Sequence, residues 1–234
     1  MDTALRLATP ISVNHRAALQ PGKRYAALTF DDGFLNVLDN AVPELVRRNI
    51  PATIFVVAGL LGKSPSWDTF GADYIRSERL ISAAQLQGLP RDLITIGSHT
   101  TSHAWLPALT AEQARQEING SRDQLRALLD REIELFSFPF GACNQELIEV
   151  CREAGYTRVF TIIPRLAFSD PTEFVTGRTE ANPNDWPIEF RLKLFGAYRW
   201  LPAIFEMKKR SLEIFSSGDS ISDARKPTPC RHGP

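Results

Sequence analysis

Two adjacent carboxylates and a glycine stand in the segment Thr29-Phe30-Asp31-Asp32-Gly33. The apolar run before it, from Tyr25 to Leu28, predicts a short buried strand that ends at these carboxylates. Carboxylates so close together repel each other, and burying both is costly unless a cation neutralises one of them. An acidic turn after a strand is the usual explanation of such a triplet, so a second group must support any chemistry.

The second group is a pair of histidines in the segment His99-Thr100-Thr101-Ser102-His103. On one helical turn, imidazoles four residues apart can face the same way and bind one ion, with Thr100 and Ser102 as polar residues on the helix surface. Two imidazoles and one carboxylate make three protein ligands and leave a position for water, as in a hydrolytic metal centre. Such ligands suit Zn²⁺, and Co²⁺, Ni²⁺ or Fe²⁺ would fit as well.

The elements that must position these residues alternate between strands and helices. Further strands are predicted over 52–57, 93–96, 135–138, 156–163 and 174–179. Helices are predicted over 37–49, 82–86, 112–129, 145–154 and 188–209. The alternation favours a parallel sheet or a β/α barrel, in which reactive groups lie at the carboxyl ends of the strands. Asp31, Asp32, His99, His103 and the turn Pro139-Phe140-Gly141 all lie at such ends.

We expect one barrel domain over residues 25–210, after an irregular lead-in over 1–24 and before a disordered tail over 211–234. Within the 234 residues, 27 Lys and Arg balance 27 Asp and Glu, so no overall field attracts nucleic acid or an anionic membrane. The three cysteines show no CxxC spacing, which favours a reducing compartment over a disulfide framework. No secretion signal or membrane-spanning run is evident, so a soluble, cytoplasmic protein is expected.

Three motifs in this order resemble those of a known family: Thr29-Phe30-Asp31-Asp32-Gly33, His99-Thr100-Thr101-Ser102-His103 and Phe138-Pro139-Phe140-Gly141. They are similar to the first three motifs of the polysaccharide deacetylases, the NodB-homology or carbohydrate esterase family 4 domain. The resemblance runs from about Tyr25 to Thr161. It implies an α/β fold of the distorted (β/α) barrel type and a divalent metal, most simply Zn²⁺. The implied reaction removes the N-acetyl group from an amino sugar in a polysaccharide, glycolipid or saccharide precursor.

The resemblance also implies roles for single residues. Asp32, His99 and His103 match the metal ligands, and Asp31 matches the catalytic base. The backbone N–H of Phe140 matches a donor to the oxyanion. In physical terms, a metal-activated water attacks the acetyl carbonyl while Asp31 accepts its proton, which leaves a free amine and acetate.

Two departures from the family pattern affect the proton transfers. The third motif often opens with an arginine that orients the base, and Ser137 stands at the equivalent position. No Leu-x-His stretch follows Thr161, so the usual histidine acid is absent and only His15 and His232 remain outside the motifs. Neither is a good candidate, and the general acid stays unassigned. Arg178 could lie at a late strand end, supply positive charge there and contribute to substrate binding.

The remaining candidates concern what the protein binds. Pro139, Trp186 and Trp67 could line a sugar subsite, although ordinary packing explains each tryptophan at least as well. The basic, amphipathic stretch 190–210 could lie on a membrane, but we expect it to pack on the barrel. Two other functions stay open: a hydrolase that opens cyclic amides such as ureides on a related barrel, and a carbohydrate-binding relative that has lost turnover.

Overall fold

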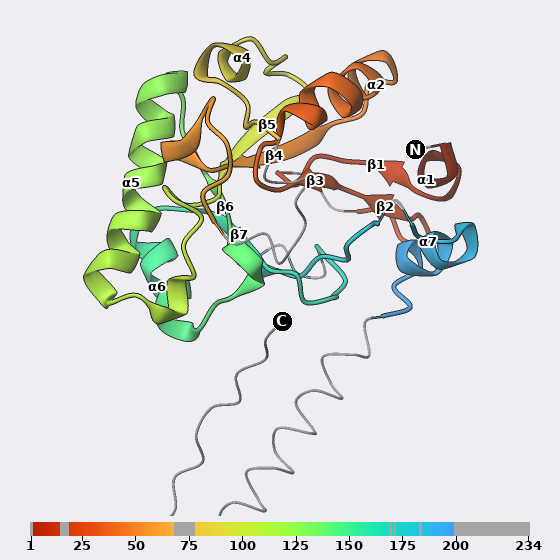
Figure 1. The fold of residues 1–234 in the computed structure, drawn as a ribbon. Helices are drawn as coiled ribbons and strands as arrows, with labels where there is room; N and C mark the ends of the chain where they lie inside the picture. The colour runs from red at the N-terminus through yellow and green to blue at the C-terminus, as the bar shows by residue number, and fades with distance from the viewer. Residues whose placement is uncertain are drawn as a thin grey trace, which may run out of the picture. The chain divides into compact units, whose positions relative to one another are not determined.

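The computed structural model describes residues 2–198 except 15–18, 68–77, 169, 171 and 183 (Figure 1). Its main sheet has six strands in the order β3-β4-β5-β6-β7-β8, and every neighbouring pair is parallel. The strands are β3 (Leu28–Phe30), β4 (Ala52–Val56), β5 (Ile94–Ser98), β6 (Leu135–Ser137), β7 (Arg158–Phe160) and β8 (Val175–Thr176). Because consecutive strands are neighbours throughout, the sheet curls in one direction into part of a barrel, and the predicted distorted (β/α) barrel is confirmed.

Helices cover the outside of this sheet, with α5 and α6 along one side and α2 and α4 nearby (Figure 1). They are α2 (Val42–Arg47), α4 (Ala83–Gln87), α5 (Ala111–Leu129) and α6 (Gln145–Glu153). A further helix, α7 (Pro187–Leu194), buries none of its residues. Capping boxes start two of them, from Ser82 in α4 and from Thr110 in α5. Helix α5 buries residues at a spacing of three and four, and this stripe faces the sheet.

Two apolar clusters lie on the two faces of the sheet, because side chains alternate along each strand. All five residues of β4 are buried. Ile54 and Val56 belong to the large cluster under the helices, whereas Phe55 packs with Phe160 of β7 at a ring distance of 5.1 Å. The small cluster, on the inner face of the sheet, contains only a few residues. Polar side chains can therefore occupy the carboxyl ends of the strands on this face.

The lead-in was expected to be irregular, and this prediction was wrong for its first ten residues. Helix α1 (Asp2–Leu7) is followed by β1 (Thr9–Pro10), which pairs in parallel with β2 (Tyr25–Ala26). None of the residues of α1 is fully buried, and β1 has only two residues. Elements so short and so exposed leave no apolar period in a sequence.

The predicted helix over 37–49 is instead two pieces, a π-helical turn (Val37–Ala41) and then α2. Pro43 lacks the N–H that a continuous α-helix would need at this point, and the Val42 N–H bonds back to Val37. The strand predicted over 156–163 is limited to β7, and the one over 174–179 to β8.

Of the helix predicted over 188–209, the part that is described ends at Leu194, and residues 199–209 lie outside the described residues. Gly196 has a φ of 72°, its N–H bonds to Lys193, and the Ala197 N–H bonds to Leu192. This Schellman arrangement terminates a helix. The helix leaves Trp186, Ile188 and other apolar side chains exposed.

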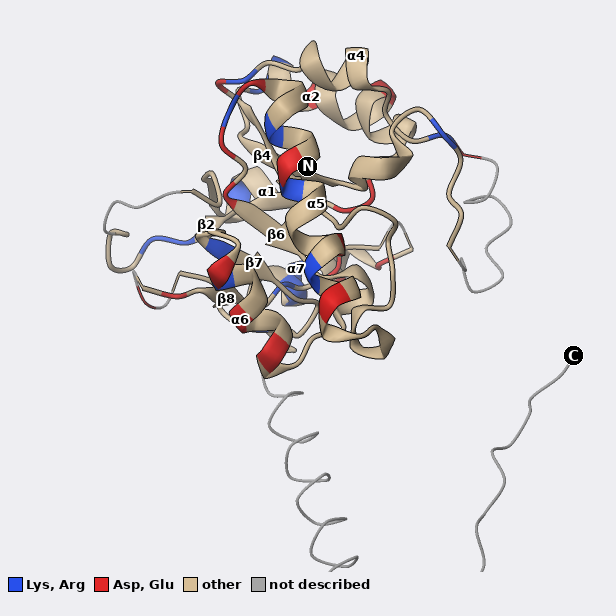
Figure 2. Ribbon diagram, turned by 90° about the vertical axis from the view of Figure 1, so that its left-hand side faces the viewer, with Lys and Arg blue, Asp and Glu red and all other residues tan. Residues whose placement is uncertain are grey.

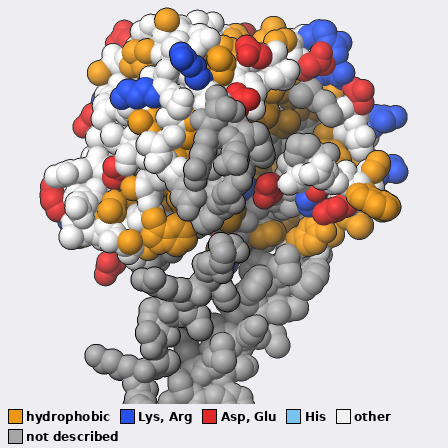
Figure 3. Space-filling view, in the orientation of Figure 1, with side chains coloured by type: hydrophobic (Ala, Val, Ile, Leu, Met, Phe, Trp, Pro, Cys, Tyr) orange, Lys and Arg blue, Asp and Glu red, His pale blue; other side chains and the backbone are white. Residues whose placement is uncertain are grey.

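All described residues belong to one compact unit, residues 1–199. The predicted domain boundary after residue 210, the predicted tail over 211–234, and His15 and His232 lie outside the described residues. In the described part, no helix has both the length and the apolar character needed to cross a bilayer. Basic and acidic residues are scattered over several elements of the ribbon in Figure 2, and Figure 3 shows apolar, basic and acidic side chains interspersed on one face.

Candidate active site

The carboxylates and the histidines meet at one edge of the sheet. Asp31 and Asp32 follow the last residue of β3, and His99 follows the last residue of β5. Strand β4 lies between them and is parallel to both, and the His99 N–H extends the ladder to the Val56 carbonyl at 2.9 Å. The carboxyl ends of three neighbouring strands therefore bring these residues together.

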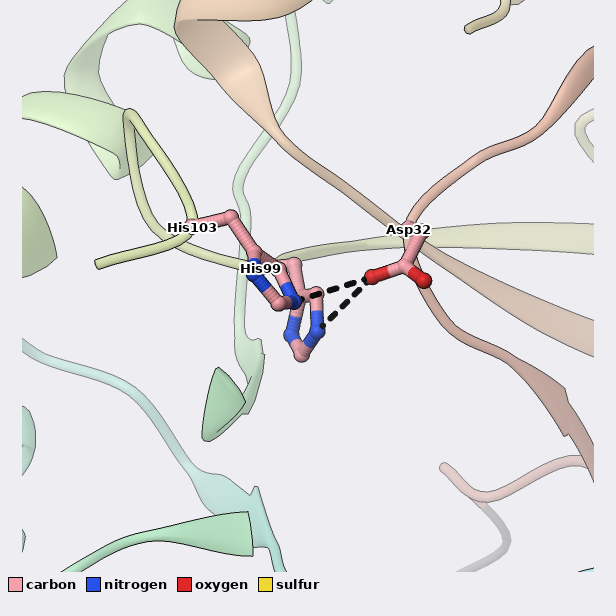
Figure 4. A group of neighbouring side chains, drawn as sticks. All are labelled: Asp32, His99 and His103. Atoms are coloured by element: carbon pink, nitrogen blue, oxygen red, sulfur yellow. Dashed lines mark ion pairs between the residues drawn. The ribbon is translucent and has the colours of Figure 1, made fainter. Parts of the chain in front are cut away.

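Asp32, His99 and His103 point toward one another (Figure 4). The Asp32 Oδ1 atom lies 3.3 Å from Nε2 of His99 and 3.1 Å from Nε2 of His103. One potential ligand atom from each residue lies within 4.8 Å of the others. Both imidazoles are buried, with 2% of His99 and 5% of His103 exposed. The three side chains thus enclose one point.

The hydrogen bonding of His99 tests whether a cation fits at that point. Its Nδ1 lies 2.7 Å from the Ser137 carbonyl, which can only accept, so Nδ1 carries the hydrogen. In a neutral ring, Nε2 then presents a lone pair to Asp32 Oδ1, which is itself buried and accepts no hydrogen bond of normal geometry. Two facing lone pairs repel each other, and a cation between them removes the conflict. The donor set of two imidazoles and a carboxylate fits zinc or a similar ion.

The charges of Asp32 and His103 fit a bound cation, whereas the carboxylates of Asp32 and Asp31 raise the pKa of His99. Burial would raise the pKa of Asp32, but the nearby imidazoles of His103 and His99 lower it well below its usual range. Burial lowers the pKa of His103, and this outweighs the effect of Asp32. Asp32 is therefore an anion and His103 favours the neutral ring, the forms in which both residues bind metal.

The two histidines do not lie on a helical turn, and the prediction of one was wrong. Thr100 and His103 both have left-handed backbone conformations, with φ of 68° and 62°. The Thr100 hydroxyl is buried and accepts a hydrogen bond from the His103 N–H at 2.9 Å, while Ser102 bonds to Glu117 of α5. A threonine is strained in this conformation, so contacts outside the loop must maintain it.

Asp31 is held by Arg178, which follows β8. Two guanidinium nitrogens of Arg178 donate to the two carboxylate oxygens, each at 2.7 Å. The other donors bond to the Thr29 hydroxyl at 3.0 Å, the Ser137 hydroxyl at 2.8 Å and the Thr161 carbonyl at 3.3 Å. All five N–H groups of the guanidinium are therefore used, and none is left for a substrate.

In the family pattern, an arginine at the position of Ser137 orients the base. In this protein Arg178 approaches Asp31 from the end of β8 and provides the guanidinium that Ser137 lacks. Burial would raise the pKa of Asp31, but Arg178 and His99 lower it, so the carboxylate stays ionised. Arg178 had been a candidate for substrate binding, and the structure directs it at Asp31 instead. The two residues are 147 positions apart, so no local pattern in the sequence could pair them.

The turn Pro139–Gly141 lies beside His103. Phe140 has a φ of 58°, and its ring lies 4.6 Å from the His103 ring. Gly141 has a φ of 65°, and a side chain there would collide with Ile162, so a glycine is required. Pro139 is buried at the start of the turn. The oxyanion role of the Phe140 N–H stays a prediction.

The two tryptophans expected near a sugar lie in different places. Trp67 stacks on the His103 ring at 4.2 Å and contacts Phe34 at 6.2 Å. Trp186 precedes α7 with 74% of its surface exposed. In the described part of the chain, Trp186 makes no ring contact or hydrogen bond with Asp31, Asp32 or the histidines. Only Trp67 therefore belongs to the site's surroundings.

A family profile described as "Polysaccharide deacetylase" matches residues 18–159. The chain is 26% identical over 179 residues to YxkH of Bacillus subtilis (strain 168), a match covering 76% of this chain and 57% of that protein. It is 22% identical over 165 residues to the poly-beta-1,6-N-acetyl-D-glucosamine N-deacetylase of Staphylococcus aureus (strain MSSA476), covering 63% of this chain and 56% of that enzyme. The chain thus spans little more than half the length of these relatives.

A solved structure, the Streptococcus pyogenes deacetylase PplD in complex with acetate, has a similar fold. The TM-score is 0.62 at 20% sequence identity, and the match covers 75% of this chain and 73% of PplD. The resemblance inferred from the three motifs is confirmed. Since the profile matches more than half of its residues, the protein belongs to the polysaccharide deacetylase family.

Proposed function

We propose that this protein is a metal-dependent hydrolase that removes the N-acetyl group from an amino sugar in a polysaccharide, glycolipid or saccharide precursor. The observation that carries the proposal is the convergence of Asp32, His99 and His103, with Asp31 next to them in the chain. The Staphylococcus aureus relative, whose name describes an N-deacetylase of a poly-N-acetylglucosamine, supports the substrate class.

Asp32, His99 and His103 would hold the divalent cation, with Zn²⁺ as the first choice and Co²⁺, Ni²⁺ or Fe²⁺ as alternatives. When bound, such an ion polarises the acetyl carbonyl and lowers the pKa of a water molecule. The Ser137 carbonyl would keep the hydrogen of His99 on Nδ1, so that Nε2 faces the cation.

Asp31 would accept the proton of the attacking water. Its bidentate bond to Arg178 fixes the plane of the carboxylate and keeps it ionised at neutral pH. The backbone N–H of Phe140 would donate to the oxyanion of the tetrahedral intermediate. Trp67 would keep the His103 ring in place by stacking on it.

A cyclic amide or ureide hydrolase is the first alternative, because the same base and cation could open a cyclic amide. A carbohydrate-binding relative without turnover is the second, motivated by the missing late histidine. Against the second, the Asp31–Arg178 pair keeps a base ionised, and a protein that only binds has no need of one.

The test is acetate release from N-acetylglucosamine oligomers, with and without a chelator, alongside a panel of small cyclic amides. The proposal predicts acetate release that stops on chelation, resumes with Zn²⁺ or Co²⁺, and is absent in Asp32→Ala. Activity unaffected by chelation or by Asp32→Ala would reject the metal mechanism. Hydrolysis of cyclic amides alone would favour the first alternative, and glycan binding without acetate release the second.

Zinc as the native metal and a cytoplasmic location remain predictions from the sequence. Contact with a membrane through α7 and the segment after it also remains untested.

A further inference from the structure

The loop between the two histidines is held by a carboxylate outside the site. Glu117 lies on α5, and its Oε2 atom accepts the N–H groups of Thr101 and Ser102, both at 2.9 Å. Its Oε1 atom accepts the Ser102 hydroxyl at 2.7 Å. The Thr101 hydroxyl in turn donates to the backbone carbonyl of Glu117 at 3.3 Å. Two consecutive backbone N–H groups thus form a small nest around one carboxylate.

This nest lies between the left-handed residues of the loop. Thr100 precedes it and His103 follows it, and both have a positive φ, which is a strained conformation for the β-branched Thr100. On the other side of the loop, the N–H groups of Ala58 and Gly59 donate to the carbonyls of Thr100 and Thr101 at 3.0 and 2.9 Å. The loop's carbonyls are therefore fixed by one element and its N–H groups by Glu117.

The two histidines depend on Glu117 to different degrees. His99 is held by the strand ladder at Val56 and by the Ser137 carbonyl, neither of which involves the loop. His103 lies at the far end of the loop, and its N–H bonds only to Thr100 within it. Without Glu117, the N–H groups of Thr101 and Ser102 would turn to water, and the strained turn would relax toward a conformation that moves His103.

We propose that Glu117 is a positioning residue for the metal centre, which sets the place of His103 through the backbone of Thr101 and Ser102. The inference rests on the proposed metal site. Glu117 touches neither Asp32 nor the histidines in any described contact, so it acts through the loop. No pattern in the sequence marks it, because a single glutamate on a helix is ordinarily a solvated surface residue.

The experiment compares the metal affinity of purified, metal-free variants by competition with a chromophoric chelator for Zn²⁺. We expect Glu117→Ala to weaken binding about 10- to 100-fold, the usual effect of removing a group that orients a ligand. Glu117→Gln keeps one acceptor oxygen for the backbone N–H groups and should recover part of the loss. Glu112→Ala on the same helix removes a surface hydrogen bond that Gln116 donates and should leave the affinity unchanged.

A second readout separates positioning from a general loss of stability. The visible spectrum of bound Co²⁺ should change in Glu117→Ala, because the geometry of the His103 ligand changes. Ile133→Val, in the core, lowers the unfolding temperature without touching the loop and should leave the spectrum and the affinity as in the wild type.

Wild-type affinity and spectrum in Glu117→Ala would overturn the inference while the proposed function stands. So would an affinity loss that Ile133→Val reproduces at a similar loss of stability. A wild-type protein that binds neither Zn²⁺ nor Co²⁺ would overturn both the inference and the proposed metal centre.

Discussion

Asp31 and His103 both lie next to Asp32, yet different parts of the chain hold them. Asp31 is fixed by side chains: Arg178 binds both of its oxygens and is itself bonded to Thr29, Ser137 and Thr161. The backbone of His103 ends a loop whose peptide groups bond to Glu117 and to the turn at Ala58 and Gly59, and Trp67 stacks on the His103 ring.

Substitutions near Asp31, here called the Asp31 side, should therefore act differently from substitutions in the loop around His103, here called the His103 side. On the Asp31 side the contacts are between charges, so a substitution alters the protonation of the base as well as its position. On the His103 side the contacts hold a strained backbone, so a substitution alters geometry and with it metal affinity. Variants of the first side should therefore change kcat and the pH profile, and variants of the second should change metal binding.

The largest effect on catalysis should come from Asp31→Asn. Removing the general base should lower kcat by about 10²- to 10⁴-fold, and Zn²⁺ affinity should stay near that of the wild type. The measurements are acetate release and chelator competition on the same preparation. A large loss of Zn²⁺ affinity in Asp31→Asn would show that the Asp31 side also determines metal binding, which would contradict the comparison.

Arg178→Met should have the next largest effect. The carboxylate loses its bidentate partner, and a displaced base costs on the order of 10²-fold in kcat. Arg178 lowers the pKa of Asp31, so its removal leaves burial to raise that pKa. The acidic limb of the kcat profile should therefore move to higher pH, because the base must be ionised to act.

Arg178→Lys is the matched control for that prediction. It keeps the positive charge but loses the planar fork, so it should restore part of the pH profile and less of the rate. An acidic limb that does not move in Arg178→Met would contradict the assignment of Asp31 as the base.

Gly59→Ala should have a smaller effect, which we expect on Zn²⁺ affinity and not on the pH profile. A Cβ atom at residue 59 would lie 2.7 Å from the Thr101 carbonyl oxygen, so the histidine loop must shift. We expect Zn²⁺ affinity to fall about tenfold and the pH profile of the remaining activity to keep its shape. In Gly88→Ala the new Cβ meets backbone oxygens only at 3.6 Å, and wild-type affinity is expected. Equal affinities of the two variants would argue against a loop that needs its present conformation.

The sequence predicted the fold and the central residues because their signals are local. Apolar runs and caps mark most strands and helices within a few residues of their ends. Asp31, Asp32, His99 and His103 stand directly after strands, so a parallel sheet was enough to bring them to one edge. The elements that were missed or misjudged, such as α1 and the two-part helix at residues 37–47, are short or interrupted.

The supporting residues could not be predicted in the same way. Arg178 and Glu117 act across 147 and 16 positions of the chain, and each is bonded through a conformation that only the folded backbone defines. The left-handed conformation of Thr100 likewise has no signature in the sequence, since a β-branched residue rarely adopts it. A helical turn was the simplest prediction for two histidines four residues apart. In the structure, a loop with left-handed residues at Thr100 and His103 directs both imidazoles toward Asp32 instead.

The most direct test is a titration of the metal-free protein with Zn²⁺ by isothermal calorimetry, for the wild type and for Asp32→Ala. The account predicts one equivalent bound by the wild type and no comparable binding by the variant, whose two imidazoles lack the carboxylate. Equal binding by both proteins would contradict a metal centre built on Asp32, His99 and His103.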